Sequence, residues 1–299
     1  MKHSSIILAL LMGLYALSSC NKDIAPESGA GNETGLLTKG ELVLNLDFPE
    51  AVATKAVSAY TTAQSYETQV NSVQILVFAS DGKIDKYLNA GTSTSGISVS
   101  TVSGTKTVWA VVNGPDLKSV GTISELQGTA ITLGGNQSTT ASTGFIMAGS
   151  NTCTVGSSSS SCSITVSRFV SRVALVSITN SLPASYGAMT VNCAYLTNVV
   201  GNQNLAGSAS ASTWYNKFGR ADETPQVSSH IIDGGTYKAS CEALTYKGIS
   251  ASAANGSSHT PSTPYLFYGF PNGSTAAPGN FSTTFSAQRS VLVVKATVG

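Results

Sequence analysis

The sequence has few charged residues and very little histidine. Only 10% of its 299 residues are charged, against roughly 25% in an average soluble protein, and 16 Lys and Arg balance 15 Asp and Glu. Without a basic excess the chain cannot neutralise phosphates, which argues against a nucleic-acid binder. Three histidines leave little room for a His-rich zinc site or a Ser-His-Asp relay, so an enzyme is not expected. The sequence also lacks a phosphate loop and metal-spaced ligands, so we expect no cofactor and no metal.

Apolar residues and small hydroxyl residues are abundant instead. Hydrophobic residues make up 41% of the chain, and 45 Ser and 33 Thr account for about a quarter of it. A chain this apolar and this weakly charged can bury a core and is not generically disordered. Its length allows one large domain or two domains of about 100 to 150 residues each.

The N-terminus is typical of an exported lipoprotein. Lys2 precedes an apolar run from Ile6 to Leu17, which is too short to cross a bilayer as a stable helix. The run ends in Leu-Ser-Ser-Cys20, which has the form of a bacterial lipobox. We therefore expect residues 1–19 to be a lipoprotein signal peptide, Cys20 to be acylated, and residues 20–39 to be a flexible lipidated tether. The alternative is an ordinary signal peptide with a chance cysteine.

The rest of the chain is predicted to be all-β. Between Glu41 and Phe48 the apolar side chains alternate with others, which indicates a half-buried strand. The residues on its apolar face are Leu42, Leu44, Leu46 and Phe48. Similar strands are expected at 70–78, 107–112, 162–166, 172–178, 189–196, 265–270 and 291–298. One short helix is expected around Leu117 to Leu126, and the stretches 157–161 and 207–212 are expected to be loop tips.

Many short strands without long helices favour a β-sandwich architecture. We predict two tandem β-sandwich domains, an N-terminal one over 40–166 and a C-terminal one over 167–299.

Four cysteines remain after Cys20, an even number that is compatible with two disulfides. Cys153 and Cys162 flank a short hairpin-like loop, so a local bond between them is the simplest pairing. It would leave Cys193 to pair with Cys241. Buried thiols without disulfides are the alternative. No CxxC motif or neighbouring His is present that would make one of these thiols reactive.

Several segments, taken in order, resemble the fimbrillin family of Bacteroidales, the type V pilins that include FimA-like and Mfa-like fimbrial subunit lipoproteins. The segments are Cys20, Glu41 to Phe48, Ala53-Thr54-Lys55-Ala56, Val73 to Phe78, Val108 to Pro115, Arg168 to Leu175 and Tyr265 to Asn272. The resemblance covers nearly all of the chain beyond the signal peptide. It implies two transthyretin-like β-sandwich domains, in agreement with the strand pattern, and an adhesive or structural subunit of a surface fimbria.

The resemblance also implies a route of assembly. The subunit would reach the outer membrane as a lipoprotein, and a trypsin-like protease would cut the loop after the first strand. By position that cut falls between Lys55 and Ala56, although family members cut by an arginine-specific protease carry Arg there. The first strand would leave, and its vacated groove would accept a strand of another fimbrial subunit. Host or bacterial surface receptors are further expected partners.

The C-terminus differs from the family pattern. Family chains usually continue past the strand at 291–298, whereas this sequence stops at Gly299. We therefore expect the C-terminal domain to be truncated at its end. The alternatives are that the sequence is a fragment, or that the subunit has no donor segment and can only accept one.

Two other functions fit parts of the sequence. The first is a surface lipoprotein that binds glycans without polymerising, since sugars stack on aromatic rings. The candidate rings are Trp214, Tyr215, Tyr237, Tyr246, Tyr265 and Tyr268. The second is a hydrolase that uses Asp222 and Glu223, the adjacent acidic pair, although neighbouring side chains usually point apart.

Overall fold

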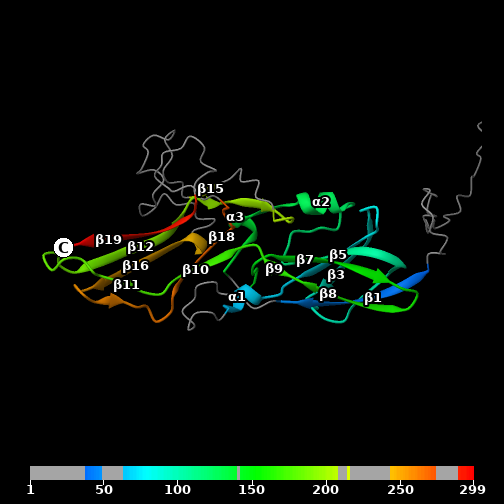
Figure 1. Cartoon of the computed structure of the whole chain (residues 1–299), viewed down its shortest axis with the longest axis horizontal. Coiled ribbons are helices and arrows are strands. Elements are labelled where there is room, and N and C mark those ends of the chain that lie inside the picture. Colours follow the sequence, from blue (N-terminus) through cyan, green and yellow to red (C-terminus); the bar gives the residue numbers. More distant parts are fainter. Residues whose placement is uncertain (1–37, 49–62, 140–141, 208–213, 216–242, 274–288) are drawn as a thin grey trace, which may run out of the picture. The chain divides into compact units, whose positions relative to one another are not determined.

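The structure, a computed structural model, describes residues 38–48, 63–139, 142–207, 214–215, 243–273 and 289–299 (Figure 1). All of them belong to one compact unit, Leu37–Gly299. Strands dominate this part of the chain, and its helices are short, so the all-β prediction is confirmed.

The first half of the described chain forms two facing sheets and three short helices. Its strands are β1 (Lys39–Asp47), β2 (Val73–Phe78), β3 (Ile84–Gly91), β4 (Ile97–Val102), β5 (Gly104–Val112), β6 (Ala130–Thr132), β7 (Met147–Val155), β8 (Ser159–Thr165) and β9 (Ser167–Arg168). Its helices are α1 (Ser65–Thr68), α2 (Ile123–Gly128) and α3 (Leu133–Asn136). One sheet has the strand order β3-β2-β5-β7-β9, and the other has the order β4-β1-β8.

The two sheets share an apolar core made by alternate residues of their strands. The central members of the five-stranded sheet contribute one side of the core, and the three-stranded sheet contributes the other. The buried residues are Leu42, Leu44, Leu46, Val73, Ile75, Val77, Ile97, Val99, Val108, Ala110, Val112, Met147, Cys153, Val155, Cys162, Ile164 and Val166. This packing of two inner faces is the expected arrangement of a β-sandwich.

The five-stranded sheet is also buried on its other face. All six residues of β2 are buried, because Leu76 and Phe78 point away from the first core into a second one. The chain after β5 covers that face with Leu117 and Leu126. The prediction of a half-buried strand at 70–78 was therefore wrong in its burial, because a covering segment far along the chain removes the second face from solvent.

The second half of the described chain has shorter strands in smaller sheets. They are β10 (Ser171–Leu175), β11 (Ile178–Thr179), β12 (Met189–Thr197), β13 (Val199–Val200), β14 (Asn202–Asn204), β15 (Trp214–Tyr215), β16 (Tyr246–Ala253), β17 (Ser258–His259), β18 (Tyr265–Gly269) and β19 (Val291–Val298). The main sheet has the order β16-β12-β19, and β10 pairs with β18 in a second one.

Two pairings cross the boundary expected near residue 166. β9 pairs with β7 of the first sandwich, and β14 pairs with β6. The second core likewise contains side chains from both halves, including Trp109 and Phe267. The division into domains over 40–166 and 167–299 stays a prediction.

The predicted strand ranges each hold a strand with ends shifted by a few residues, and 172–178 is split between β10 and β11. Strands β3, β4, β7 and β16 were not predicted, and neither were the short strands β6, β9, β13, β14, β15 and β17. The helix expected at Leu117 to Leu126 was placed too early, because Thr122 caps a helix that begins at Ile123. The hydroxyl of Thr122 accepts a hydrogen bond from the backbone amide of Glu125.

The serine-rich stretch 157–161 is not only a loop tip. Its last three residues are the first three of β8, where they pair with β1 from Glu41 to Val43. This segment has no apolar pattern of its own, and it forms part of a strand because its backbone pairs with β1, which is strongly apolar. In the other stretch, residues 208–212 lie outside the described residues.

A buried polar cluster lies at one end of the first core. Lys106 of β5 is 4% exposed, and its Nζ lies 2.7 Å from Oδ2 of Asp85 in β3. The hydroxyl of Thr101 in β4 donates a hydrogen bond to the same carboxylate oxygen. Burial opposes ionisation of Asp85, but the hydrogen bonds from Lys106 and Thr101 and the charge of Lys106 outweigh it and lower the pKa of Asp85.

The stabilisation from Asp85 should depend on pH. Because its pKa in the folded protein lies below the usual 3.8, its contribution is complete above about pH 4 and is lost as the pH falls through the folded pKa. We expect Asp85→Asn to lower the free energy of unfolding at pH 7. The gap, which is the difference in that free energy between wild type and variant, should narrow at pH 2. Urea unfolding at the two pH values measures the gap. A gap that stays constant would contradict an ionised, stabilising Asp85.

Candidate functional site

Strand β1 is the centre of the three-stranded sheet (Figure 1). It pairs antiparallel with β4 from Lys39 to Leu44 and parallel with β8 from Glu41 to Asp47. Of the strands described, β4 and β8 pair with β1 and with no other strand. The backbone of β1 is therefore what joins these two strands into a sheet.

The side chains of β1 alternate between core and surface as the sequence predicts. Leu42 and Leu44 are fully buried and Leu46 is 7% exposed. Phe48 follows the end of the strand and packs, partly buried, against the same core. The four residues of the strand that the family resemblance implies is removable thus pack into the same core. We call the space that β1 fills between β4 and β8 the β1 slot.

A disulfide crosses between the two sheets beside the β1 slot. It joins Cys153 of β7 to Cys162 of β8, with their Cα atoms 6.0 Å apart. Cys162 is the register partner of Leu44, so the disulfide lies next to the middle of β1. Cys193 is buried in β12 and packs with Tyr195. Because Cys241 lies outside the described residues, its pairing with Cys193 stays a prediction.

Two further contacts hold β8 against β7. The side-chain amide of Asn151 donates a hydrogen bond of 2.8 Å to the backbone oxygen of Ser163. Gly149 lies so close to β8 that a Cβ atom there would meet the backbone oxygen of Thr165 at 1.9 Å. A side chain at residue 149 would therefore push the two strands apart.

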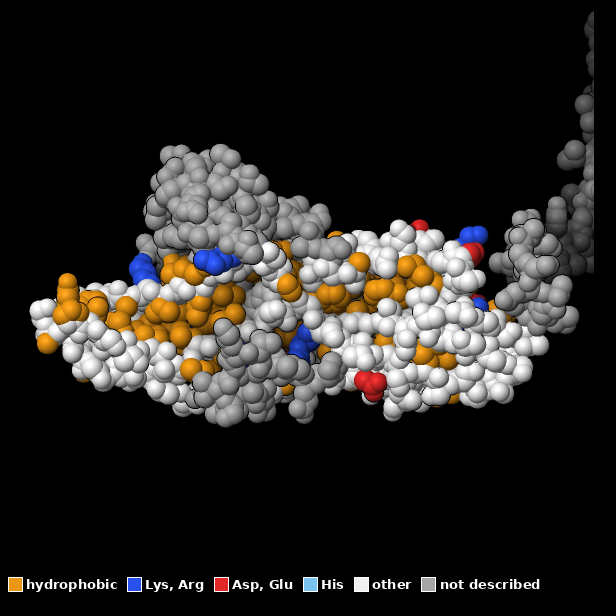
Figure 2. All heavy atoms as spheres, viewed as in Figure 1, with side chains coloured by type: hydrophobic (Ala, Val, Ile, Leu, Met, Phe, Trp, Pro, Cys, Tyr) orange, Lys and Arg blue, Asp and Glu red, His pale blue; other side chains and the backbone are white. Residues whose placement is uncertain are grey.

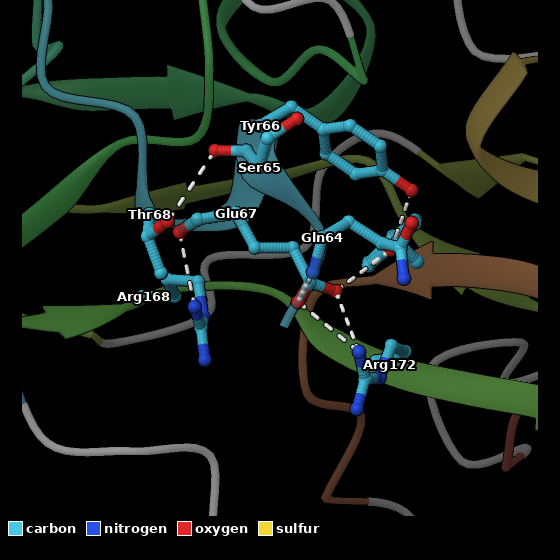
Figure 3. Close-up of polar contacts among 8 residues, drawn as sticks. Gln64, Ser65, Tyr66, Glu67, Thr68, Arg168 and Arg172 are labelled. Atoms are coloured by element: carbon cyan, nitrogen blue, oxygen red, sulfur yellow. Dashed lines mark hydrogen bonds and ion pairs between the residues drawn. The ribbon is translucent and has the colours of Figure 1, made fainter. Parts of the chain in front are cut away.

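Helix α1 follows the segment that contains the candidate cleavage site, and a buried carboxylate fixes it. Glu67 is 2% exposed, and both of its carboxylate oxygens accept hydrogen bonds of 3.1 Å from Nη1 of Arg172 in β10 (Figure 3). Tyr268 of β18 donates a hydrogen bond of 2.7 Å to Oε1. The backbone amide of Gln64 donates to Oε2, and Arg168 donates to the backbone oxygen of Glu67. Apart from the amide of Gln64, the groups that bind this carboxylate lie far along the chain.

Aromatic rings surround this carboxylate. The ring of Tyr66 meets Phe145 and Tyr268 edge-on, with centroids 5.8 and 6.0 Å apart respectively. Burial, followed by the hydrogen bonds that the Tyr268 hydroxyl makes with Tyr66 and Glu67, raises the pKa of that hydroxyl. The hydroxyl therefore holds its proton more tightly than a free tyrosine does, which favours the hydrogen bond that it donates to Glu67. The cluster fastens α1 to β10 and β18.

Sequence reasoning missed Glu67 and its partners. Arg168, Arg172 and Tyr268 belong to the segments that carry the family resemblance. Nothing in their spacing links them to a glutamate that lies 101 residues before the first of them and 201 before the last. A faint signal was the polar sequence Gln-Ser-Tyr-Glu, because Gln64 and Glu67 form a capping box around α1.

Several predicted site residues lie outside the described residues. They are Cys20, Lys55, Ala56, Asp222, Glu223, Tyr237 and Cys241. Among the rings proposed to stack on sugars, Trp214 and Tyr215 form β15, and Tyr246 and Tyr265 are partly buried. Tyr268 is 1% exposed and committed to Glu67, so its ring is closed to a sugar, contrary to that hypothesis.

The described surface carries little charge. On the face shown in Figure 2, acidic and basic side chains are few among neutral and apolar ones. Within the described ranges no group of three or more His, Cys, Asp or Glu is placed to hold a metal ion. In the same ranges no helix is long and apolar enough to cross a membrane.

The described part of the chain is an all-β fold. A sequence profile for the major fimbrial subunit protein (FimA) matches residues 41–224, which is more than half of the chain. The chain belongs to this family of fimbrial subunits, so the resemblance found from the sequence is confirmed. Subunits of this family build cell-surface fimbriae, and their role is structural.

Solved structures share the fold. A proposed cell adhesion protein of Bacteroides eggerthii DSM 20697 is 17% identical with a TM-score of 0.55, over 90% of this chain and 77% of that one. A second, from Parabacteroides distasonis ATCC 8503, is 14% identical with a TM-score of 0.57, over 87% and 75% of the two chains. At such low identity the likeness extends to the fold alone. No curated protein sequence matches the chain.

The Glu67 cluster gives a prediction about stability. Glu67→Gln removes the charge that Arg172 faces, and breaking a buried ion pair from one side costs about 3 to 5 kcal/mol. Because glutamine keeps part of the hydrogen bonding, we expect a loss of at least about 2 kcal/mol in the free energy of unfolding, measured by urea denaturation.

The matched control is Asp81→Asn. Asp81 and Lys83 form an exposed ion pair of 3.6 Å, so its loss should change stability by less than about 1 kcal/mol. Equal effects of the two substitutions would show that the Glu67 cluster does not fasten α1.

Proposed function

We propose that this fimbrial subunit is exported as a lipoprotein and assembles by protease-triggered donor-strand exchange, with β1 as the strand that is removed. A trypsin-like protease would cut between Lys55 and Ala56. An extended segment of another fimbrial subunit would then occupy the β1 slot. The observation that carries the proposal is the position of β1, a central strand whose two neighbours pair with no other described strand.

The burial of β1 supplies the driving force for its replacement. Full burial of an aliphatic side chain stabilises by about 1.5 to 3 kcal/mol, so Leu42, Leu44 and Leu46 together contribute roughly 5 to 9 kcal/mol before ordering costs. An empty slot would expose that apolar surface together with the unpaired edges of β4 and β8. An incoming strand recovers both terms, because main-chain hydrogen bonds and alternate side chains act together.

The location of the cut relative to the fixed elements also supports the proposal. Lys55 lies between the end of β1 at Asp47 and the start of α1 at Ser65. Cleavage there would separate β1 from a helix that Glu67 ties to β10 and β18. The new N-terminal segment would thus stay attached to the folded body while β1 becomes free to leave.

The low charge of the described surface suits contact between copies. Subunits with a nearly neutral surface pack side by side with little long-range repulsion. The partners we infer are other fimbrial subunits, the processing protease, the outer membrane through acylated Cys20, and receptors on host or bacterial surfaces.

Removal of the candidate cleavage site tests the processing step. We expect Lys55→Gln to prevent cleavage by a trypsin-like protease and to abolish polymers seen by electron microscopy, whereas the wild type should yield a new N-terminus at Ala56. Lys39→Gln, at the exposed start of β1, is the control and should be cleaved normally. Polymers that form from wild-type protein without any chain beginning at Ala56 would overturn the scheme.

A second test addresses export. Without its acyl chains the precursor has no lasting anchor, because stable attachment takes more than one chain or signal. We expect Cys20→Ala to shift the uncut precursor from the membrane fraction to the soluble fraction of cells, as judged by immunoblotting. Membrane-bound Cys20→Ala protein would refute the lipid anchor and leave strand exchange to be judged by the Lys55 experiment.

A further inference from the structure

The walls of the β1 slot are β4 and β8, and both lose their support when β1 leaves. Of the strands described, β4 and β8 pair with β1 alone, so each then becomes a strand with no sheet partner. The apolar contacts of Leu42, Leu44 and Leu46 disappear at the same time. Isolated strands are not stable in water, so the slot would collapse unless something else holds its walls.

The wall formed by β8 is held by a covalent link to the other sheet. The disulfide between Cys153 and Cys162 ties it to β7, and β7 lies inside the five-stranded sheet, which does not include β1. The hydrogen bond from Asn151 to Ser163 adds a second tie one residue further along β8. Neither contact involves a residue of β1, so both remain when the strand is gone.

The wall formed by β4 is held by buried polar contacts. Thr101 of β4 is the register partner of Gly40 in β1, and its hydroxyl donates to the carboxylate of Asp85 in β3. Asp85 is in turn paired with Lys106 of β5, at 2.7 Å. Asp85 and Lys106 belong to the five-stranded sheet, so this wall too is fastened to strands that stay in place. The pair is shielded from water, and shielding strengthens such contacts.

We propose that the Cys153–Cys162 disulfide and the Thr101–Asp85–Lys106 cluster keep the β1 slot open after β1 has left, and thereby set the rate at which a donor strand enters. These are positioning residues, since they hold the walls and need not touch the donor strand. A preformed slot saves the incoming strand the cost of ordering both walls. Reduction of the disulfide would release one wall, which makes assembly sensitive to redox conditions. The proposal rests on the strand exchange proposed above.

The experiment separates opening of the slot from the native processing step. A recognition sequence for a site-specific protease is inserted between residues 49 and 62 of the full chain, so that cleavage does not depend on Lys55. After cleavage, the released N-terminal segment is removed in mild denaturant by gel filtration. A fluorescent peptide with the sequence Lys39–Phe48 is then added, and its association and dissociation rates are measured by fluorescence anisotropy.

We expect the cleaved wild-type chain to bind this peptide. The variants Cys153→Ser/Cys162→Ser and Lys106→Met should each bind it with an association rate lower by roughly tenfold, the effect of about 1.4 kcal/mol. The rates at which the peptide dissociates should change little, because the bound peptide itself holds β4 and β8 once it fills the slot. Treatment of the wild type with dithiothreitol should reproduce the effect of the double serine variant.

The control is Lys83→Met, which removes the exposed pair with Asp81 and should leave both rates unchanged. Thermal unfolding of the uncut variants shows whether they fold. If Lys106→Met does not fold, Thr101→Val removes only the hydroxyl that reaches Asp85 and takes its place.

The outcomes distinguish the two proposals. Equal association rates in the wild type, in Cys153→Ser/Cys162→Ser and in Lys106→Met would overturn the positioning role and leave strand exchange intact. A cleaved wild-type chain that never binds the peptide would overturn strand exchange, and the positioning role would fall with it. A slower association confined to the disulfide variant, the Lys106 variant and the reduced protein would support both strand exchange and the positioning role.

Discussion

The pairing of one backbone segment with two neighbours on opposite sides underlies the described first half of this protein. β1 gives β4 and β8 their hydrogen-bond partners, and its leucines fill the space between two sheets. Removal of an edge strand would leave the rest of a sheet intact, whereas removal of this strand divides a sheet in two. Under the proposed strand exchange, stability and assembly would depend on the same interaction, because the strand that stabilises the uncut chain would be the strand whose replacement joins subunits.

The other fastenings in the molecule have a clear relation to that strand. Glu67 ties the segment just after residues 49–62 to β10 and β18, and the disulfide and the Asp85 cluster tie the neighbours of β1 to the opposite sheet. None of them includes a side chain of β1. In the described part of the chain, backbone pairing and buried leucines thus hold β1, whereas a disulfide and buried ionic contacts join the elements around it.

The sequence predicted the elements whose signal is local. Alternating leucines identified β1 as half-buried, and the short spacing of Cys153 and Cys162 suggested the pairing that the structure contains. It could not predict the start of β8, since Ser159 to Ser161 have no apolar pattern and are in a strand through their pairing with β1. The burial of Glu67 and Asp85 could not be predicted either, because an acid is buried only where the fold brings a partner to it. Those partners, Arg172 and Lys106, lie in strands later in the chain. Likewise, the burial of both faces of β2 depends on a later segment that covers it.

The mixed pairing of β1 has a consequence for the geometry of a fibre. β1 runs antiparallel to β4 and parallel to β8, so the two edges of the slot offer hydrogen-bond patterns that only one strand direction satisfies together. A strand inserted backwards would meet the wrong pattern on both sides. Each subunit would then accept its neighbour in a single orientation, and a fibre grown in this way would have distinct ends and one direction of growth.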